Sequence, residues 1–357
     1  MLDANVAQSA TSAPKFEPVS GKTRRVRRAV VLVTLLALAA CSDKSDPSTV
    51  AVPSPSPSSR APSTVTPTAP DTTAAPATTA APPPDIWPVP DTTGPGVVVT
   101  STGIVLPLVG AGVADTPCSN QAAAEGTPIK GANVVLDPGH GGNEPGAVGP
   151  SGLKEKDINL AIAEDVKGML EAQGAVVVLT RTGDQNTTIK TRAEIATALH
   201  PQVFLSIHHN AEPDGPSTGP GNEAYYQIAN PDSKRFAGLL WEEITSAFTP
   251  YGVAWVADTD HGAKYRPSDN GGDYYGILRR GAGTTTVLSE AAFISNPPEE
   301  KLLATEAFRH VEAVAIVAAL DRFVTGADPG SGFVVPYPRT EPAGGGGGPE
   351  GCTDPAL

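Results

Sequence analysis

The chain has 357 residues, including 37 Gly and 37 Pro, and a formal net charge of −13. Fourteen of the prolines fall between Asp46 and Pro95, so the chain is not one uniform globule and its folded part is expected after that stretch. The negative charge, with no Lys/Arg-rich stretch beyond residue 28, gives little support for nucleic acid as a partner. Three Cys are too few for a thiolate zinc finger, so His and carboxylate side chains must hold any metal.

Residues 1–40 have the features of an export signal. Basic residues precede the apolar or small residues 29–40, which are interrupted only by Thr34. A helix of this length rises about 18 Å, which is too short for a bilayer core of about 30 Å, so a secretory signal fits better than a membrane span. Leu38-Ala39-Ala40-Cys41 resembles the bacterial lipobox, which would make Cys41 a lipid anchor on the outer face of the cytoplasmic membrane. An ordinary signal peptide with an incidental Cys41 is the alternative.

Residues 41–95 are expected to be a disordered linker. Pro, Ser, Thr and Ala dominate, and almost no aliphatic side chains are present to offset the entropy of ordering the chain. A Pro-rich chain extends by about 3.1 Å per residue, so the linker would reach into a cell wall. An O-glycosylated spacer without a particular target is the alternative. Residues 96–129 are expected to form a small β appendage, because two apolar runs at 97–99 and 104–109 are bounded by Gly.

Residues 130–326 predict an α/β domain with a doubly wound, mostly parallel sheet and helices on both faces. Short apolar runs at 133–137, 175–180, 203–207 and 284–289 predict buried strands. Apolar residues at steps of three to four predict helices at 155–173 and 189–199, and further helices are expected at 233–248 and 297–323. Strands that alternate with helices favour a parallel sheet covered on both faces. Residues 327–357, rich in Gly and Pro, are expected to be a flexible tail.

Four residues with metal-binding or acid–base side chains occupy favourable places in this pattern. His140 follows the first strand and His208 ends the third. Glu155 opens the first helix, and Glu290 ends the late strand. Because ligands of open α/β sheets collect beyond the carboxyl ends of the strands, we expect these side chains to converge. Two imidazoles and one carboxylate make a three-ligand zinc set, and the remaining glutamate can serve as the base in metal-assisted amide hydrolysis.

Three other histidines are expected not to bind the metal. His209 alternates to the opposite face of its strand from His208, and His310 lies within a predicted helix. His261, close to two aspartates, is the main competitor and is a candidate for substrate contact.

Five motifs, in order along the chain, resemble the zinc-dependent N-acetylmuramoyl-L-alanine amidases of bacterial cell walls: Val135–Gly142, Glu155–Leu160, Thr180–Asp184, Ser206–Ala211 and Glu290–Asn296. The resemblance covers about residues 130 to 325. It implies a zinc ion, Zn²⁺, and cleavage of the amide between N-acetylmuramic acid and L-alanine in peptidoglycan. It also implies roles for the individual side chains: zinc ligands at His140, Glu155 and His208, proton transfer at Glu290, and substrate contacts at Asn210 and Arg279.

Some features depart from the family pattern or extend beyond it. Ser289 stands where the family usually has an aliphatic residue, and residues 258–273 do not match it. Residues 212–222 look too short and Pro-rich for the helix that blocks the site in some family members, so we expect an open cleft. Cys118 and Cys352 bracket the domain, and an exported chain permits a disulfide between them. Two free thiols are the alternative.

Two other functions remain open at this point. A wall-binding or regulatory protein could keep the fold with little or no turnover, and a zinc peptidase could act only on the stem peptide with the same site chemistry. The intact set of four polar residues favours the amidase. No residue pattern identifies a protein activator.

Overall fold

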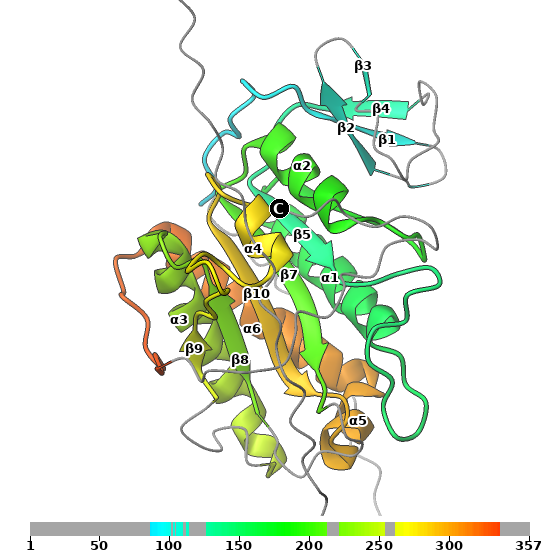
Figure 1. Cartoon of the computed structure of the whole chain (residues 1–357), viewed down its shortest axis with the longest axis vertical. Coiled ribbons are helices and arrows are strands. Elements are labelled where there is room, and N and C mark those ends of the chain that lie inside the picture. The colour runs from blue at the N-terminus through cyan, green and yellow to red at the C-terminus, as the bar shows by residue number, and fades with distance from the viewer. Residues whose placement is uncertain are drawn as a thin grey trace, which may run out of the picture. The chain divides into compact units, whose positions relative to one another are not determined.

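The structure is a computed structural model that describes residues 86–100, 103, 105–109, 112–113, 126–212, 221–253 and 261–335 (Figure 1). The expected signal segment, Cys41 and both cysteines of the expected disulfide, Cys118 and Cys352, lie outside these residues. Within the described part, no helix combines the length and the apolar character that a membrane crossing requires.

A six-stranded sheet forms the centre of the domain, with the strand order β6-β5-β7-β10-β8-β9. Its strands are β5 (Val134–Pro138), β6 (Val177–Leu179), β7 (Val203–Asn210), β8 (Glu223–Tyr226), β9 (Ala263–Lys264) and β10 (Thr286–Phe293). The first four in this order run parallel, whereas β8 is antiparallel to β10. The mostly parallel sheet expected from the sequence is confirmed.

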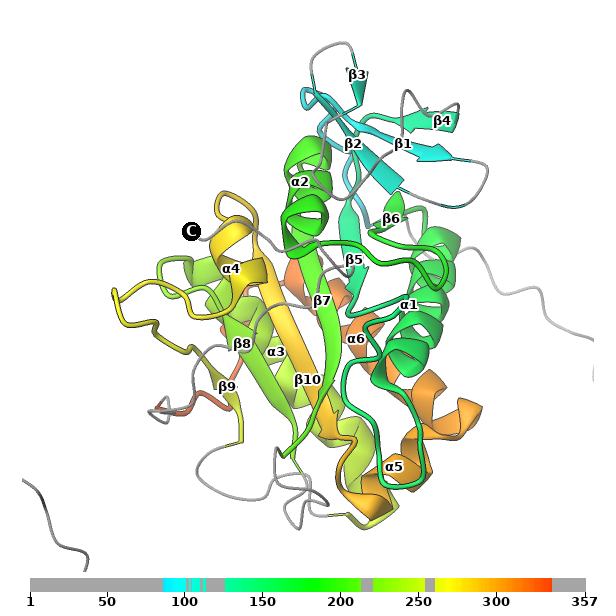
Figure 2. The same cartoon turned by 45° about the vertical axis from the view of Figure 1, so that its right-hand side comes forward.

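Helices cover both faces of this sheet (Figures 1 and 2). One face packs against α1 (Glu155–Ala172), α3 (Pro231–Phe248) and α6 (Glu306–Thr325). The other packs against α2 (Ile189–Leu199) and α4 (Gly276–Arg280). Successive residues of β5 alternate between the two cores, with Val134 and Leu136 in the first and Val135 in the second. Both faces of the strand are therefore apolar, which confirms the doubly wound α/β architecture.

The short elements are the ones that the sequence pattern did not predict. The helix expected at 189–199 has these bounds in the structure, whereas β8, β9 and α4 contain four, two and five residues and had no prediction. Such short segments show too few repeats for a period to be recognised. The helix region 297–323 divides into α5 (Pro297–Leu303) and α6, because Thr305 caps a new helix by accepting from the Phe308 N–H. A short 3₁₀ turn, η1 (Thr249–Tyr251), follows α3.

A second, antiparallel sheet precedes the domain, with the order β3-β2-β1-β4. Its strands are β1 (Val97–Thr100), β2 (Val105–Val109), β3 (Gly112–Val113) and β4 (Gly126–Ile129). Buried Val97 and Val105 join the same core as Leu199 of α2. The two runs expected to be strands correspond to β1 and β2.

Residues just before and just after the domain in the sequence also pack against it. Residues 86–95, which the sequence placed in the linker, carry Trp87 into the core beside α1, where its Nε1 is 3.4 Å from Oε1 of Gln173. Residues 327–335, expected in the tail, run beside β9, where the Ala263 N–H donates to Gly332 O and the Val334 N–H donates to Ala263 O. These short segments complete the packing around the central sheet.

Candidate metal centre and active site

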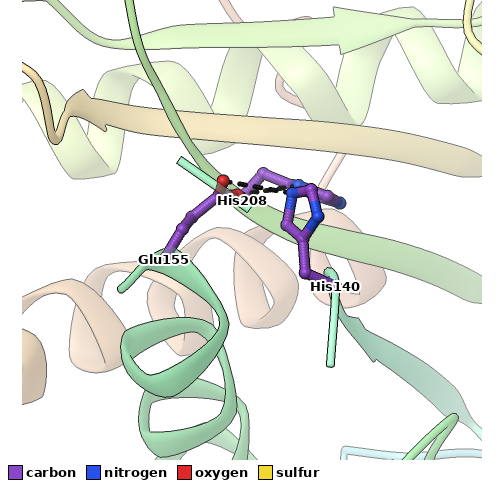
Figure 3. Close-up of side chains that lie close together, drawn as sticks. All are labelled: His140, Glu155 and His208. Atoms are coloured by element: carbon purple, nitrogen blue, oxygen red, sulfur yellow. Dashed lines mark hydrogen bonds and ion pairs between the residues drawn. The ribbon is translucent and has the colours of Figure 1, made fainter. Parts of the chain in front are cut away.

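The loop after β5, the end of β7 and the start of α1 bring His140, His208 and Glu155 together (Figure 3). One possible ligand atom from each residue lies within 4.8 Å of the others. The distance from His140 Nε2 to Glu155 Oε2 is 3.1 Å, and that from His208 Nδ1 to Glu155 Oε1 is 2.9 Å. The structure thus places side by side the three side chains that the sequence proposed as zinc ligands.

Glu155 is held in place by hydrogen bonds from the protein interior. Its side chain is almost fully buried, and it accepts from the Ala147 N–H at 2.8 Å, from Asn159 Nδ2 at 3.1 Å and from the His209 N–H at 3.2 Å. Burial by itself would raise the pKa of Glu155, but the facing rings of His140 and His208 keep this pKa well below its ordinary value. Burial also lowers the pKa of His208. The group therefore combines an ionised carboxylate with an imidazole whose neutral form is favoured.

This donor set fits a zinc ion. Two imidazole nitrogens and one carboxylate oxygen are the ligands of many catalytic zinc sites, and ligating imidazoles must be neutral. Glycines make room for them: a Cβ at Gly139 would lie 2.1 Å from Cε1 of His208, and a Cβ at Gly146 would lie 2.5 Å from Oε2 of Glu155. The backbone around the three side chains is thus shaped for their close approach.

Glu290 faces the same region from the neighbouring strand. It lies opposite His208 in the parallel pairing of β10 with β7. A cavity of about 250 Å³ is lined by Glu290 together with His140 and His208, and its other walls come from β5, α2, α4 and the residues around them. Three of the four polar residues selected from the sequence, His140, His208 and Glu290, therefore line one cavity. The fourth, Glu155, contacts both of these histidines.

Asn210 and Arg279, the expected substrate contacts, have protein partners of their own. Nδ2 of Asn210 donates to Oε2 of Glu223 at 2.8 Å, and Glu223 in turn forms a buried ion pair with Lys264 at 2.6 Å. Arg279 donates to the carbonyl oxygens of Asp273, at 2.9 Å, and Tyr274. Neither residue is among those that line the cavity in the described part of the chain.

The histidines expected to be non-ligands have other partners. His209 is buried between Asn159 and Glu312, at 2.8 and 3.1 Å, and His310 pairs with Asp165 at 2.6 Å. The ring of His261 packs against Phe293. None of these three belongs to the metal-binding cluster found among the described residues.

Tyr275 is a wall residue of the cavity that the sequence reading missed. It precedes α4, and burial together with the nearby Glu290 raises its pKa to about 12, so it stays a neutral phenol. Next to it, the guanidinium of Arg266 lies 3.6 Å from the ring centroid of Tyr274. The only sequence signal was a Tyr pair within a polar, Gly-rich stretch, which had no recognisable period.

Comparison with known proteins agrees with this arrangement. Residues 134–322 match the family described as N-acetylmuramoyl-L-alanine amidase. The amidase AmiA of Escherichia coli is 33% identical over 214 residues, which cover 51% of this chain and 73% of that protein. The amidase AmiC of Neisseria meningitidis is 31% identical over 220 residues, but the match spans only 52% of its length. The uncharacterised protein YqiI of Bacillus subtilis is 34% identical over 220 residues, which cover 61% of this chain and 95% of that protein.

Among solved structures, the CwlD amidase from Clostridioides difficile, in complex with the GerS lipoprotein, is 30% identical with a TM-score of 0.47. That match covers 54% of this chain and 98% of CwlD. The family match itself extends over more than half of the present sequence. It includes α1, β7 and β10, which carry Glu155, His208 and Glu290, and β5 with the following loop, which carries His140. The chain therefore belongs to the N-acetylmuramoyl-L-alanine amidase family.

Proposed function

We propose that this protein is a zinc-dependent hydrolase that cleaves the amide bond between N-acetylmuramic acid and L-alanine in peptidoglycan. The observation that carries the proposal is the convergence of His140, Glu155 and His208. Glu290 lines the same cavity, at the edge of the sheet where α/β enzymes bind their ligands. Membership of the amidase family supports the same bond class.

The residues divide into a metal-binding group and a proton carrier. His140, Glu155 and His208 would hold the zinc ion, which polarises a carbonyl and makes water nucleophilic near neutral pH. Glu290 would accept a proton from the attacking water and pass it to the leaving amine. As the new C–O bond forms at the lactyl carbonyl carbon, the C–N bond breaks, which leaves a lactyl carboxylate and the free amino group of L-alanine.

We also propose that the enzyme works outside the cytoplasmic membrane. The basic and apolar segment at residues 1–40 supports export, and Cys41 would carry the lipid anchor. The Pro-rich stretch that follows would give the catalytic domain reach into the wall. Mass spectrometry that shows a mature N-terminus at Cys41 with a diacylglyceryl adduct on its sulfur would support this anchor; a mature chain that begins after Cys41, or that carries Cys41 with an unmodified thiol, would contradict it.

The activity is tested on purified sacculi. The zinc-loaded chain should release peptides whose N-terminus is L-alanine and leave glycan strands with free lactyl carboxylates, both measured by mass spectrometry. Cuts confined to bonds between amino acids would assign a stem-peptide peptidase instead. Binding to sacculi without any products would assign a wall-binding protein.

A further inference from the structure

The loop that carries His140 has an unusual backbone conformation. His140 adopts φ = +61°, in the left-handed region that residues with a Cβ rarely occupy. The next two positions, which also have positive φ, are Gly141 and Gly142. A non-glycine residue keeps such a conformation only where its surroundings hold it there. Contacts with the rest of the domain must therefore hold His140 in this conformation.

Arg192 of α2 reaches the loop from one face of the sheet. Its Nη2 donates to the carbonyl oxygen of His140 at 2.6 Å. Its Nη1 donates to the carbonyl oxygen of Pro138 at 2.8 Å and to Oδ1 of Asp137 at 2.6 Å. One guanidinium thus spans the end of β5 and the left-handed residue. The side chain is almost fully buried and also lines the cavity beside His140.

Arg181, from the Thr180–Asp184 motif, holds the same loop and links it to α1. Its Nε donates to the Pro138 carbonyl at 2.8 Å, and its Nη2 donates to the carbonyls of Gly139 at 3.0 Å and Lys156 at 2.8 Å. Lys156 immediately follows Glu155 in the first turn of α1. Arg181 therefore links Gly139, the residue before His140, to Lys156, the residue after Glu155.

The charges of this arrangement are balanced locally. Asp137 is buried and also accepts from Thr180 Oγ1 at 2.5 Å and Ser206 Oγ at 2.6 Å. Although burial alone would raise the pKa of Asp137, Arg192 and these hydroxyls keep it below its ordinary value, so the carboxylate remains ionised. Burial and the neighbouring Arg192 lower the pKa of Arg181 to about 10, which still leaves it protonated at neutral pH.

We propose that Arg181 and Arg192 are positioning residues that hold His140 in its metal-binding orientation. They act through consecutive backbone carbonyls, and the role rests on the proposed zinc-dependent function. A planar guanidinium can bridge several acceptors at once, whereas the ammonium of Lys is a compact charge on a flexible stem. Without the bridge, the loop relaxes and the His140 ring leaves the other ligands.

The test compares zinc affinity in matched Arg→Lys variants of the full chain. Arg192→Lys should weaken zinc binding by about 10- to 100-fold, the usual effect of removing support from a metal ligand, as measured by competition with a chromophoric chelator. Arg181→Lys, which leaves the ion pair of Asp137 in place, should act in the same direction. The control is Arg235→Lys. Arg235 also donates to backbone carbonyls, but these four, from Arg322, Phe323, Gly326 and Asp328, lie at the end of α6 and just after it. This substitution should lower the melting temperature and leave zinc affinity unchanged.

Thermal unfolding with and without Zn²⁺ separates folding from metal binding. Each folded Arg192→Lys or Arg181→Lys variant should show a smaller zinc-induced rise in melting temperature than the wild type. If one variant does not fold, the other gives the same comparison. If both bind zinc as tightly as the wild type, the positioning role is overturned. If the wild-type chain itself binds no zinc, the proposed function fails and not merely this inference.

Discussion

Glu290 is the residue whose side chain faces the metal-binding cluster without belonging to it. Its position opposite His208 suits proton transfer, and Glu290→Gln keeps the size of the side chain but removes its basicity. We expect turnover on sacculi to fall by about 10²- to 10⁴-fold, while zinc content measured by elemental analysis stays at the wild-type level. Ser289→Ala, one residue earlier in β10, is the control and should keep its activity. Full activity in Glu290→Gln would assign the proton transfer to another group.

The stability of the fold should also depend on pH through a second carboxyl group, that of Glu299. Its side chain is fully buried, with Oε1 3.3 Å from the Gly221 N and Oε2 3.0 Å from the Phe293 N. Burial raises its pKa from 4.5 to about 9. Between pH 4.5 and about pH 9, the folded state keeps a proton on Glu299 that the unfolded chain has lost, so the free energy of unfolding falls as the pH rises.

We therefore expect the melting temperature to decline between pH 5 and pH 9, with a smaller decline in Glu299→Gln, which has no titrating proton. At pH 5 the Gln variant should be less stable by about 1–3 kcal/mol, because its NH₂ group must face one of the two backbone N–H donors. Thermal melts at several pH values measure both effects. Equal slopes for the two proteins would show that Glu299 is ionised throughout.

At the scale of elements, a side-chain cap marks the start of α2, one of the helices that line the cavity. Thr188 is the N-cap of α2 and accepts from the Thr191 N–H at 3.1 Å. Thr188→Ala should lower the free energy of unfolding by about 1 kcal/mol, measured by urea denaturation, because the first turn loses its acceptor. Thr188→Ser keeps the hydroxyl and should retain most of that stability. A loss of similar size in both variants would attribute the effect to the methyl group instead of the cap.

The sequence was sufficient for the long elements and for the polar residues that follow them. α1 and α2 have clear helical periods, and β5 and β7 are recognisable as short apolar runs, so His140, Glu155 and His208 could be placed at one edge of the sheet from the sequence. The short elements β8, β9 and α4 were not predictable, because segments of two to five residues carry no period. The support by Arg181 and Arg192 was hidden for a different reason: their partners are backbone carbonyls, which have no residue-specific signature.

At the scale of the whole molecule, the metal-binding cluster and the contact made by Trp87 lie at opposite ends of α1. Glu155 is the first residue of this helix, and Gln173, which meets Trp87, caps its other end. Eighteen helical residues span about 27 Å, so the two places share no contact. Stability contributed by Trp87 should therefore be separable from metal binding.

Trp87 offers a direct test of that separation. Its side chain is 5% exposed within the core, so Trp87→Ala leaves a large cavity and should lower stability by about 3–5 kcal/mol, or roughly 6–20 °C in melting temperature. Trp87→Phe keeps most of the apolar contact but loses part of the ring packing and the bond to Gln173, so a smaller loss is expected. Zinc affinity should be the same in both variants as in the wild type. Wild-type stability in Trp87→Ala would mean that residues 86–95 are not anchored to the domain in solution, and weakened zinc binding would mean that the two ends of α1 are coupled.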